Sequence, residues 1–439
     1  MAWPQSLLLS HPSLATLRHR NFRLIWVGLL LSFTGSFMQT AALLWHVSLL
    51  VSPDRKGLAL GAVGLVRVVP IIVFSMISGV VADAWDRRRL MLATQVGAAL
   101  TAVALAVLTL QGLSVVWPIY VLAALSSAVG AFDLPARQAL VPTLVPRDEL
   151  PHAIGLNTIM MQTAQVLGPA LGGIVIATVG VAGVYVLNAA SFLAVIAALL
   201  MMRHVPMRPA MSAGHDAVSW AAAREGVRFV FRSPLIRSTM LLDFFATFFS
   251  SATALLPIFA QDILRVGPSG YGWLYAAPAI GATLTSAVMV FVTGRIERRG
   301  PVLLWAVGLY GAATVAFGFS RTFWLTFACL VLSGVADTVS MVIRNIIRQL
   351  ETPDHLRGRM TGVNMVFFQG GPQLGELEAG AVANWWGAPF SVVTGGIGCL
   401  LAVAWVAATT PQLCAYRAHP LPAATSAPDG DDEPTAMSR

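Results

Sequence analysis

Four ionisable residues interrupt long apolar segments of the chain: Arg67, Asp243, Glu376 and Glu378. A charge inside a membrane-spanning helix costs at least about 2.5 kcal/mol on insertion scales, so each of these residues is a candidate for function. Arg67 lies about 13 Å from the nearer end of its predicted helix at 1.5 Å per residue, close to the middle. An arginine at this depth either holds an anionic substrate or forms a permanent ion pair with a carboxylate.

The three carboxylates offer proton chemistry. Asp243 lies about a turn and a half from the start of its predicted helix, where it either accepts a proton or caps a neighbouring helix. Glu376 and Glu378 are about 200° apart around their helix, so they cannot both face one cavity. Burial in an apolar site favours the neutral carboxyl group, as proton transport requires. We favour Glu376 over Glu378 because it follows Gly375, and structural pairing is the alternative for both.

Neutral polar residues and missing sequence motifs further limit which functions the chain can have. Gln39 is a candidate for lining a substrate path, although a helix-to-helix hydrogen bond is its more ordinary role. The sequence has neither a GxxxxGK[ST] nor an HExxH pattern, which argues against an ATP-driven pump and a zinc protease. The three cysteines are odd in number and irregularly spaced, so we expect no disulfide framework, no metal and no cofactor. We do not expect an enzyme.

The composition identifies the elements that must position these residues. Hydrophobic residues make up 56% of the 439 residues and charged residues only 11%, whereas soluble domains carry about 25% charged residues. Long apolar runs predict a first set of six helices near 24–50, 58–82, 89–111, 115–138, 153–178 and 181–202. A second set is predicted near 238–261, 270–293, 301–319, 322–345, 359–383 and 386–409. We therefore expect an all-α integral membrane protein with twelve transmembrane helices.

The polar segments divide the chain into parts. We expect a first six-helix bundle over 1–202, a central cytoplasmic loop over 203–237, a second bundle over 238–410 and a disordered tail over 411–439. The central loop contains the amphipathic stretch REGVRFVFR, which is typical of a helix at the membrane surface.

The basic residues predict the orientation. Of 28 basic residues, 23 fall in segments that share one side of the membrane if the amino terminus is cytoplasmic, and four fall on the other side. By the positive-inside rule, both termini are cytoplasmic. The formal charge of +8 then reflects topology, and we expect no nucleic-acid partner.

The two predicted halves repeat each other weakly. Gly130 precedes Asp133 by three residues in the fourth helix, and Gly334 precedes Asp337 by three in the tenth. The sequences GPALGG at 168–173 and GPQLGE at 371–376 follow in the next helix of each half. Parallel six-helix halves are an architecture of secondary transporters, whose sites lie between the repeats near the membrane midplane.

The segment GVVADAWDRRRLM at 79–91 carries the strongest local signal. Its Gly79, Asp83, Arg87 and Arg88 resemble the loop motif of the major facilitator superfamily, which implies a gating role. The arginines are expected to pair with Asp83 or with Asp133 on the same side of the membrane. A simple positive-inside anchor is the alternative.

The fifth helix resembles the antiporter signature of the same superfamily. The matching positions are Gly155, Gly168, Pro169, Gly172 and Gly173, with Ala164 where glycine is usual. Small residues permit close helix contact and proline bends a helix. The resemblance implies export, and ordinary small-residue packing is the alternative.

Further segments resemble the subgroup that includes enterobactin exporters and macrolide-efflux proteins, among them LRHRNFRLIW, LLPIFAQDIL and LRGRMTGVN. The resemblance implies a bacterial inner-membrane exporter of siderophore-like or drug-like molecules, coupled to protons. We expect a monomer surrounded by lipid. The fourth helix departs from the pattern, because it lacks the arginine of many proton-coupled drug antiporters. A nutrient importer and a non-transporting accessory or sensor protein remain alternatives.

Overall fold

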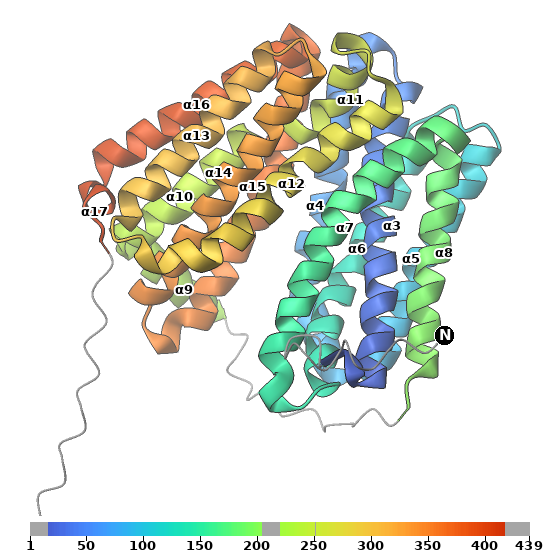
Figure 1. Ribbon diagram of the computed structural model, residues 1–439, viewed down its shortest axis with the longest axis horizontal. Helices are drawn as coiled ribbons and strands as arrows, with labels where there is room; N and C mark the ends of the chain where they lie inside the picture. Colours follow the sequence, from blue (N-terminus) through green and yellow to red (C-terminus); the bar gives the residue numbers. More distant parts are fainter. Residues whose placement is uncertain (1–15, 204–219, 251, 418–439) are drawn as a thin grey trace, which may run out of the picture.

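The computed structural model describes residues 16–203, 220–250 and 252–417, and these ranges contain helices but no strands. The first half comprises α3 (Arg20–Leu50), α4 (Lys56–Ala84), α5 (Arg87–Leu110), α6 (Trp117–Leu140), α7 (Leu150–Val179) and α8 (Val181–Met201). After the short α9 (Trp220–Arg232), the second half comprises α10 (Pro234–Phe249), α11 (Leu256–Ile258), α12 (Gly267–Val292), α13 (Arg299–Phe319), α14 (Phe323–Glu351), α15 (Arg357–Trp386) and α16 (Ala388–Thr409). The predicted all-helical fold is confirmed for these residues (Figure 1).

Eleven spans within the described residues are long and apolar enough to cross a membrane. In hydrocarbon a helix satisfies its own backbone hydrogen bonds, which is why the apolar runs fold this way. The helix α15 has the length, 30 residues, but is less apolar because it carries Glu376, Glu378 and several glycines. This helix tolerates polar residues because it packs against three neighbours, α4, α10 and α16, which shield it from lipid.

The packing of the two halves is pseudo-symmetric. In the first half α3 packs on α7 and α8, α4 on α6, and α5 on α6 and α8. In the second half α10 packs on α15 and α16, α12 on α14, and α13 on α14 and α16. Each contact in one half thus has its counterpart in the other.

The halves meet along two helix pairs, α4 with α15 and α7 with α12. Glycines permit these contacts: a Cβ on Gly61 would lie 2.8 Å from the carbonyl oxygen of Glu376, and one on Gly173 would lie 2.8 Å from Cα of Gly272. We call the end of the molecule where α3 begins and α16 ends the terminal face, and the opposite end the distal face. In Figure 1 the halves converge toward the distal face.

The seventh span differs from the single predicted helix. The helix α10 ends at Phe249, a 3-10 turn covers Ala252–Leu255, and a π-turn over Phe259–Ile263 follows α11. Pro257, at the start of α11, cannot donate a backbone hydrogen bond to the carbonyl four residues earlier, so the turn over Ala252–Leu255 does not continue as a regular α-helix.

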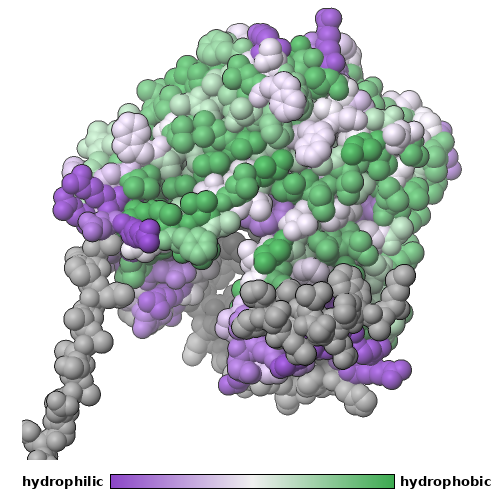
Figure 2. Space-filling model, in the orientation of Figure 1, coloured by the Kyte–Doolittle hydropathy of each residue, from purple (hydrophilic) through white to green (hydrophobic). Residues whose placement is uncertain are grey.

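The outer surface is strongly apolar. Figure 2 shows hydrophobic side chains over most of the visible face, with hydrophilic ones at its two ends. Large apolar side chains such as Phe291 and Trp305 are each 79% exposed, as expected for contact with lipid. Trp117, Trp324, Trp385 and Trp386 are exposed at helix ends on the distal face, where tryptophan is enriched in membrane proteins.

Residues 411–417, expected to begin the tail, are packed. The short helix α17 (Pro411–Cys414) lies against α13, and the backbone N–H of Gly300 donates to the carbonyl of Tyr416 at 3.1 Å. Residues 418–439 lie outside the described ranges, as do residues 204–219 of the predicted central loop.

Candidate functional site

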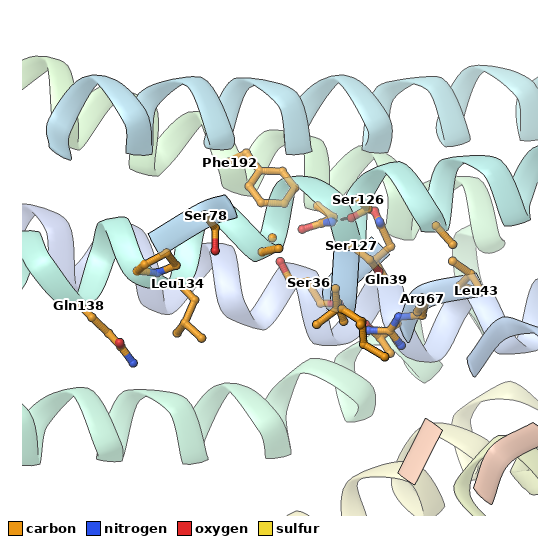
Figure 3. A pocket seen from close by; sticks show the side chains of 18 of the residues that line it. Ser36, Gln39, Leu43, Arg67, Ser78, Ser126, Ser127, Leu134, Gln138 and Phe192 are labelled. Carbon is orange, nitrogen blue, oxygen red and sulfur yellow. Dashed lines mark hydrogen bonds between the residues drawn. The ribbon is translucent and has the colours of Figure 1, made fainter. Parts of the chain in front are cut away.

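A cavity of ≈ 740 Å³ is lined almost entirely by the first half, through α3, α4, α6 and α8, and Gly362 and Gly370 of α15 are its lining residues from the second half. Its polar lining consists of hydroxyl and amide side chains, namely Ser36, Gln39, Thr40, Ser78, Ser126, Ser127, Gln138 and Asn188. Among its described lining residues, Arg67 carries the one charge. Figure 3 shows Arg67 and Gln138 toward opposite ends of this cavity. Since α6 ends at Leu140, Gln138 marks the end nearer the terminal face.

Gln39 lies at the cavity and also makes a helix-to-helix hydrogen bond, while its role in a substrate path stays a prediction. It lines the cavity, and its Oε1 accepts a hydrogen bond of 2.7 Å from Nδ2 of Asn188 on α8. Both residues are buried. The pair fixes an amide at the wall of the cavity.

Arg67 interacts electrostatically with Glu376, which belongs to the other half. The carboxylate of Glu376 lies directly over Gly64, one helical turn from Arg67: a Cβ on Gly64 would lie 2.7 Å from Oε2 of Glu376. Tyr275 on α12 interacts electrostatically with both charges. The cation that lines the cavity is therefore coupled to the α4–α15 contact between the halves.

Glu378 lies on another side of α15, as the helical spacing predicts. It is partly buried, and the described residues contain no hydrogen-bond or ion-pair partner for it. Nothing in the described structure joins Glu378 to the cavity.

Polar contacts tie the halves together at the distal face. Nζ of Lys56, at the start of α4, lies 3.0 Å from Oδ2 of Asp262 and donates to Oε1 of Gln261 at 3.0 Å. Nε2 of Gln261 donates to Ser48 on α3 at 2.7 Å. Asp262 and Gln261 belong to the π-turn, so the interrupted seventh span presents two consecutive polar side chains to the first half. We call Ser48, Lys56, Gln261 and Asp262 the distal lock.

At the terminal face, the ion pairs among the described residues stay within one half. Glu149 contacts Arg18 and His19 of the first half. Arg359 on α15 contacts Glu225 on α9, both in the second half. Figure 2 shows the surface notched between the halves at this end. Among the described residues, ion pairs thus join the halves at the distal face and not at the terminal face.

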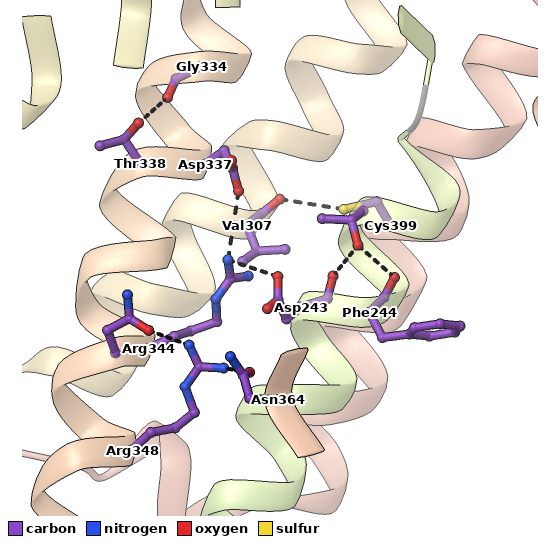
Figure 4. Close-up of polar contacts among 12 residues, drawn as sticks. Asp243, Phe244, Val307, Gly334, Asp337, Thr338, Arg344, Arg348, Asn364 and Cys399 are labelled. Carbon is purple, nitrogen blue, oxygen red and sulfur yellow. Dashed lines mark hydrogen bonds and ion pairs between the residues drawn. The ribbon is translucent and has the colours of Figure 1, made fainter. Parts of the chain in front are cut away.

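Asp243 is part of a buried ion cluster in the second half (Figure 4). Its Oδ1 lies 2.9 Å from Nη2 of Arg344, and the side chains of both are at most 3% exposed. The same Nη2 lies 3.7 Å from Oδ1 of Asp337, whose side chain is 47% exposed. One turn beyond, Arg348 donates to Asn364 and Asn345. Asp243 therefore has a close structural partner and does not line the cavity.

Asp133 lies in the corresponding cluster of the first half. Its Oδ1 accepts hydrogen bonds from Oγ1 of Thr94 at 3.0 Å and Nε2 of Gln95 at 2.8 Å. Its Oδ2 lies 3.9 Å from Nη1 of Arg137, which stacks over the ring of Phe33.

The gating motif is described only in part. Gly79 and Asp83 lie on α4, and their side-chain environments lie outside the described part of the structure. Arg88 donates to the carbonyl of Leu200 at 3.2 Å, and Arg87 is partly buried near it at the start of α5. The gating role of Asp83, Arg87, Arg88 and Asp133 stays a prediction.

The glycines of the antiporter-like motif have different neighbours. A Cβ on Gly168 or Gly172 would meet α3 of the same half, at Phe37 and Met38. Gly173, after Pro169 in α7, faces Pro268 and Gly272 of the other half. A Cβ on Gly155 would have no neighbour within 4 Å among the described atoms. Only the distal part of the motif is thus packed at the interface between halves.

Sequence reasoning missed the distal lock and the second carboxylate of the buried cluster. The signal for the lock was available, because Lys56 is the one lysine of the chain, beside 27 arginines. The signal for the cluster was the repeat itself, which marked Asp337 without pairing it with Asp243 or Arg344.

Comparisons with known proteins agree with this architecture. A family profile described as transmembrane secretion effector matches residues 11–426. The multidrug efflux pump Tap of Mycolicibacterium fortuitum is 29% identical over 371 residues, 82% of this chain and 88% of its own. The enterobactin exporter EntS of Escherichia coli O1:K1 / APEC is 28% identical over 363 residues, 82% of this chain and 84% of its own.

Solved transporters share the fold. A bacterial homolog of the human lysosomal transporter Spinster, inward-facing and unoccupied, superposes with a TM-score of 0.72 at 14% identity, covering 91% of this chain and 99% of its own. An inward-facing bacterial homologue of the iron transporter ferroportin gives 0.65 at 16% identity, covering 90% and 99%. The profile match spans nearly the whole chain, so this membrane protein belongs to the transmembrane secretion effector family of major facilitator superfamily transporters.

Proposed function

We propose that the protein exports a small amphipathic molecule across the bacterial cytoplasmic membrane by alternating access, as a monomer, in exchange for protons. The observation that carries this proposal is the cavity lined by Arg67, in a molecule whose halves are joined at the distal face by the distal lock. Its volume of ≈ 740 Å³ is within the range of sites for drug-sized molecules, about 300 to 1,000 Å³.

The distribution of arginines supports the orientation. The terminal face carries most of the basic residues, so the positive-inside rule makes it cytoplasmic. The cavity then faces the cytoplasm, where an exporter loads its substrate, and the distal lock closes the outer side.

The lining supports the substrate class. Hydroxyl and amide groups suit a molecule with several polar atoms, and Arg67 suits an anionic group on it. Two relatives are named for enterobactin export and for multidrug efflux, which supports a small-molecule substrate. An anionic, siderophore-like molecule fits the lining better than a lipophilic cation, because Arg67 repels a cation.

The experiment compares accumulation of radiolabelled enterobactin and of ethidium in cells with and without the protein. Each probe is measured with and without a proton uncoupler, and Arg67→Gln serves as the variant. The proposal expects uncoupler-sensitive export of enterobactin that Arg67→Gln strongly reduces at low substrate concentration. Equal accumulation of both probes with and without the protein would contradict export of either class, and uncoupler-insensitive export would remove the proton exchange.

A further inference from the structure

We propose that Asp337 takes up and releases the coupling proton, with Arg344 as its movable counter-ion. This inference rests on the proposed proton exchange and names its site. The two residues lie on α14, outside the residues that line the cavity.

A buried polar stripe runs along α14. Ser333, Asp337, Ser340, Arg344 and Arg348 follow one another at spacings of three or four residues, so they share one face of the helix. Four of them are at most 9% exposed, and Asp337 is the accessible member. The stripe extends from the middle of α14 almost to its end at Glu351, on the terminal face.

The two carboxylates beside Arg344, Asp243 and Asp337, differ in their distance from the guanidinium and in their exposure. Asp243 is sealed and close, at 2.9 Å, so protonating it would break a tight buried ion pair. Asp337 is looser, at 3.7 Å, and its side chain is 47% exposed. Asp337 is therefore the more accessible of the two carboxylates, and a proton can bind to it without loss of the Asp243–Arg344 pair.

Arg344 has the freedom that a movable counter-ion needs. The whole residue is only 2% exposed. Its Nε and Nη1 atoms are buried and have no hydrogen-bond partner among the described residues. An unpaired buried donor is costly, so the guanidinium gains by turning toward whichever carboxylate is charged. When Asp337 binds a proton from water, Arg344 turns fully to Asp243; when the proton leaves, Arg344 is shared again.

Other groups face the same cluster. Tyr310 of α13 interacts electrostatically with Asp337, Arg344 and Asp243, and Cys399 of α16 interacts with Asp337. Arg348, which also interacts with Arg344, donates to Asn364 on α15. The helix α15 contacts α4 of the other half. A rotation of the Arg344 side chain can therefore act on the interface between the halves through Arg348 and α15.

The first half provides an internal comparison. Asp133 accepts from Thr94 and Gln95 and lies beside Arg137, with its side chain 16% exposed. Neutral donors satisfy this carboxylate in its ionised form, whereas Asp337 has no such donors among the described residues. The pseudo-symmetric positions thus hold one fixed and one exchangeable carboxylate.

Glu376 is the less suitable coupling residue. It attracts Arg67, so a proton on Glu376 would free Arg67 to bind an anionic substrate. Proton and substrate would then bind together, which favours cotransport and not exchange. Asp337 avoids this conflict because it does not contact the cavity cation.

Infrared difference spectroscopy of the purified full-length protein during a pH titration tests the site without any substrate. We expect wild type to show the carbonyl band of a carboxyl group that deprotonates, Asp337→Asn to lose it, and Asp337→Glu to restore it at a shifted position. The matched variant Asp133→Asn should keep the band. The same titrating band in Asp337→Asn would overturn the proposal.

Proteoliposomes separate this inference from the proposed function. We expect enterobactin efflux through wild type to be accelerated by an imposed pH gradient, and efflux through Asp337→Asn to lose that acceleration. A gradient effect retained in Asp337→Asn would refute Asp337 as the coupling site. Absence of enterobactin and ethidium transport by wild type would refute the proposed export, while the infrared result would still decide where the proton binds.

Discussion

Nζ of Lys56 and Oδ2 of Asp262 lie 3.0 Å apart and join the two halves of the transporter at the distal face. Lys56 is 9% exposed, so its amine is shielded while the lock is closed. In an alternating-access cycle this contact must break whenever the distal face opens. Because Lys56 is the one lysine in the sequence, its reactivity reports on the lock.

Asp262→Asn should open the distal lock more often. An ion pair with one exposed partner is worth up to about 1 kcal/mol, so we expect up to about a fivefold increase in the open population. The measurement is modification of Lys56 by a membrane-impermeant amine reagent, located by mass spectrometry. Asp54→Asn is the control, since Asp54 is exposed on the same face and lies 3.9 Å from Arg55. Equal labelling in wild type and both variants would show that the pair does not hold the face closed.

Gly173→Ala should disturb the closed distal face, whereas Gly155→Ala should not. The added Cβ at Gly173 would lie 2.5 Å from the carbonyl oxygen of Pro268, and backbone there must move. Overpacking of this kind costs about 1 to 3 kcal/mol. Lys56 labelling should rise and transport should slow for Gly173→Ala alone. Equal Lys56 labelling and equal transport rates in the two variants would show that the α7–α12 contact does not help to close the distal face.

Asp243→Asn should destabilise the protein. It leaves Arg344 as an incompletely paired buried charge, and such losses cost about 3 to 5 kcal/mol. We expect a lower midpoint of thermal unfolding in detergent, and partial recovery in Asp243→Leu combined with Arg344→Leu. An unchanged midpoint for Asp243→Asn would mean that the pair is not structural.

Arg67→Gln should weaken binding of an anionic substrate and leave the fold intact. A hydrogen bond to a charged group contributes about 1.5 to 3 kcal/mol, which corresponds to a rise in KM of about ten-fold to more than a hundred-fold. Arg67→Lys should retain part of the affinity. Gln138→Ala, at the other end of the cavity, is the comparison and should raise KM less. A KM that is the same for Arg67→Gln and wild type would exclude Arg67 from the substrate site.

The helices could be predicted because a segment that spans a membrane must be a long apolar run, which is visible in the local sequence. Residues 181–202 were expected to be helical and α8 covers Val181–Met201, since apolar length alone sets such ends. The break after Phe249 was not predicted, although Pro257 lies in that span, because proline is often tolerated within membrane helices.

The site was harder to predict because its contacts depend on which helix faces meet. The position of Arg67 within a span was evident from the sequence, but its coupling to Glu376 requires the close approach that Gly64 allows. Asp243 and Arg344 are 101 positions apart in sequence, and nothing local joins them. The Lys56–Asp262 contact likewise depends on the π-turn that follows the break.

The most direct test of export through this cavity is flux of radiolabelled enterobactin from proteoliposomes that contain only the purified protein. The lumen is loaded with the compound, and efflux is followed with a pH gradient imposed or collapsed. We predict gradient-stimulated efflux through wild type and, at a lumenal concentration near the wild-type KM, much slower efflux through Arg67→Gln. Efflux at the protein-free rate through wild type, for both enterobactin and ethidium, would contradict the account.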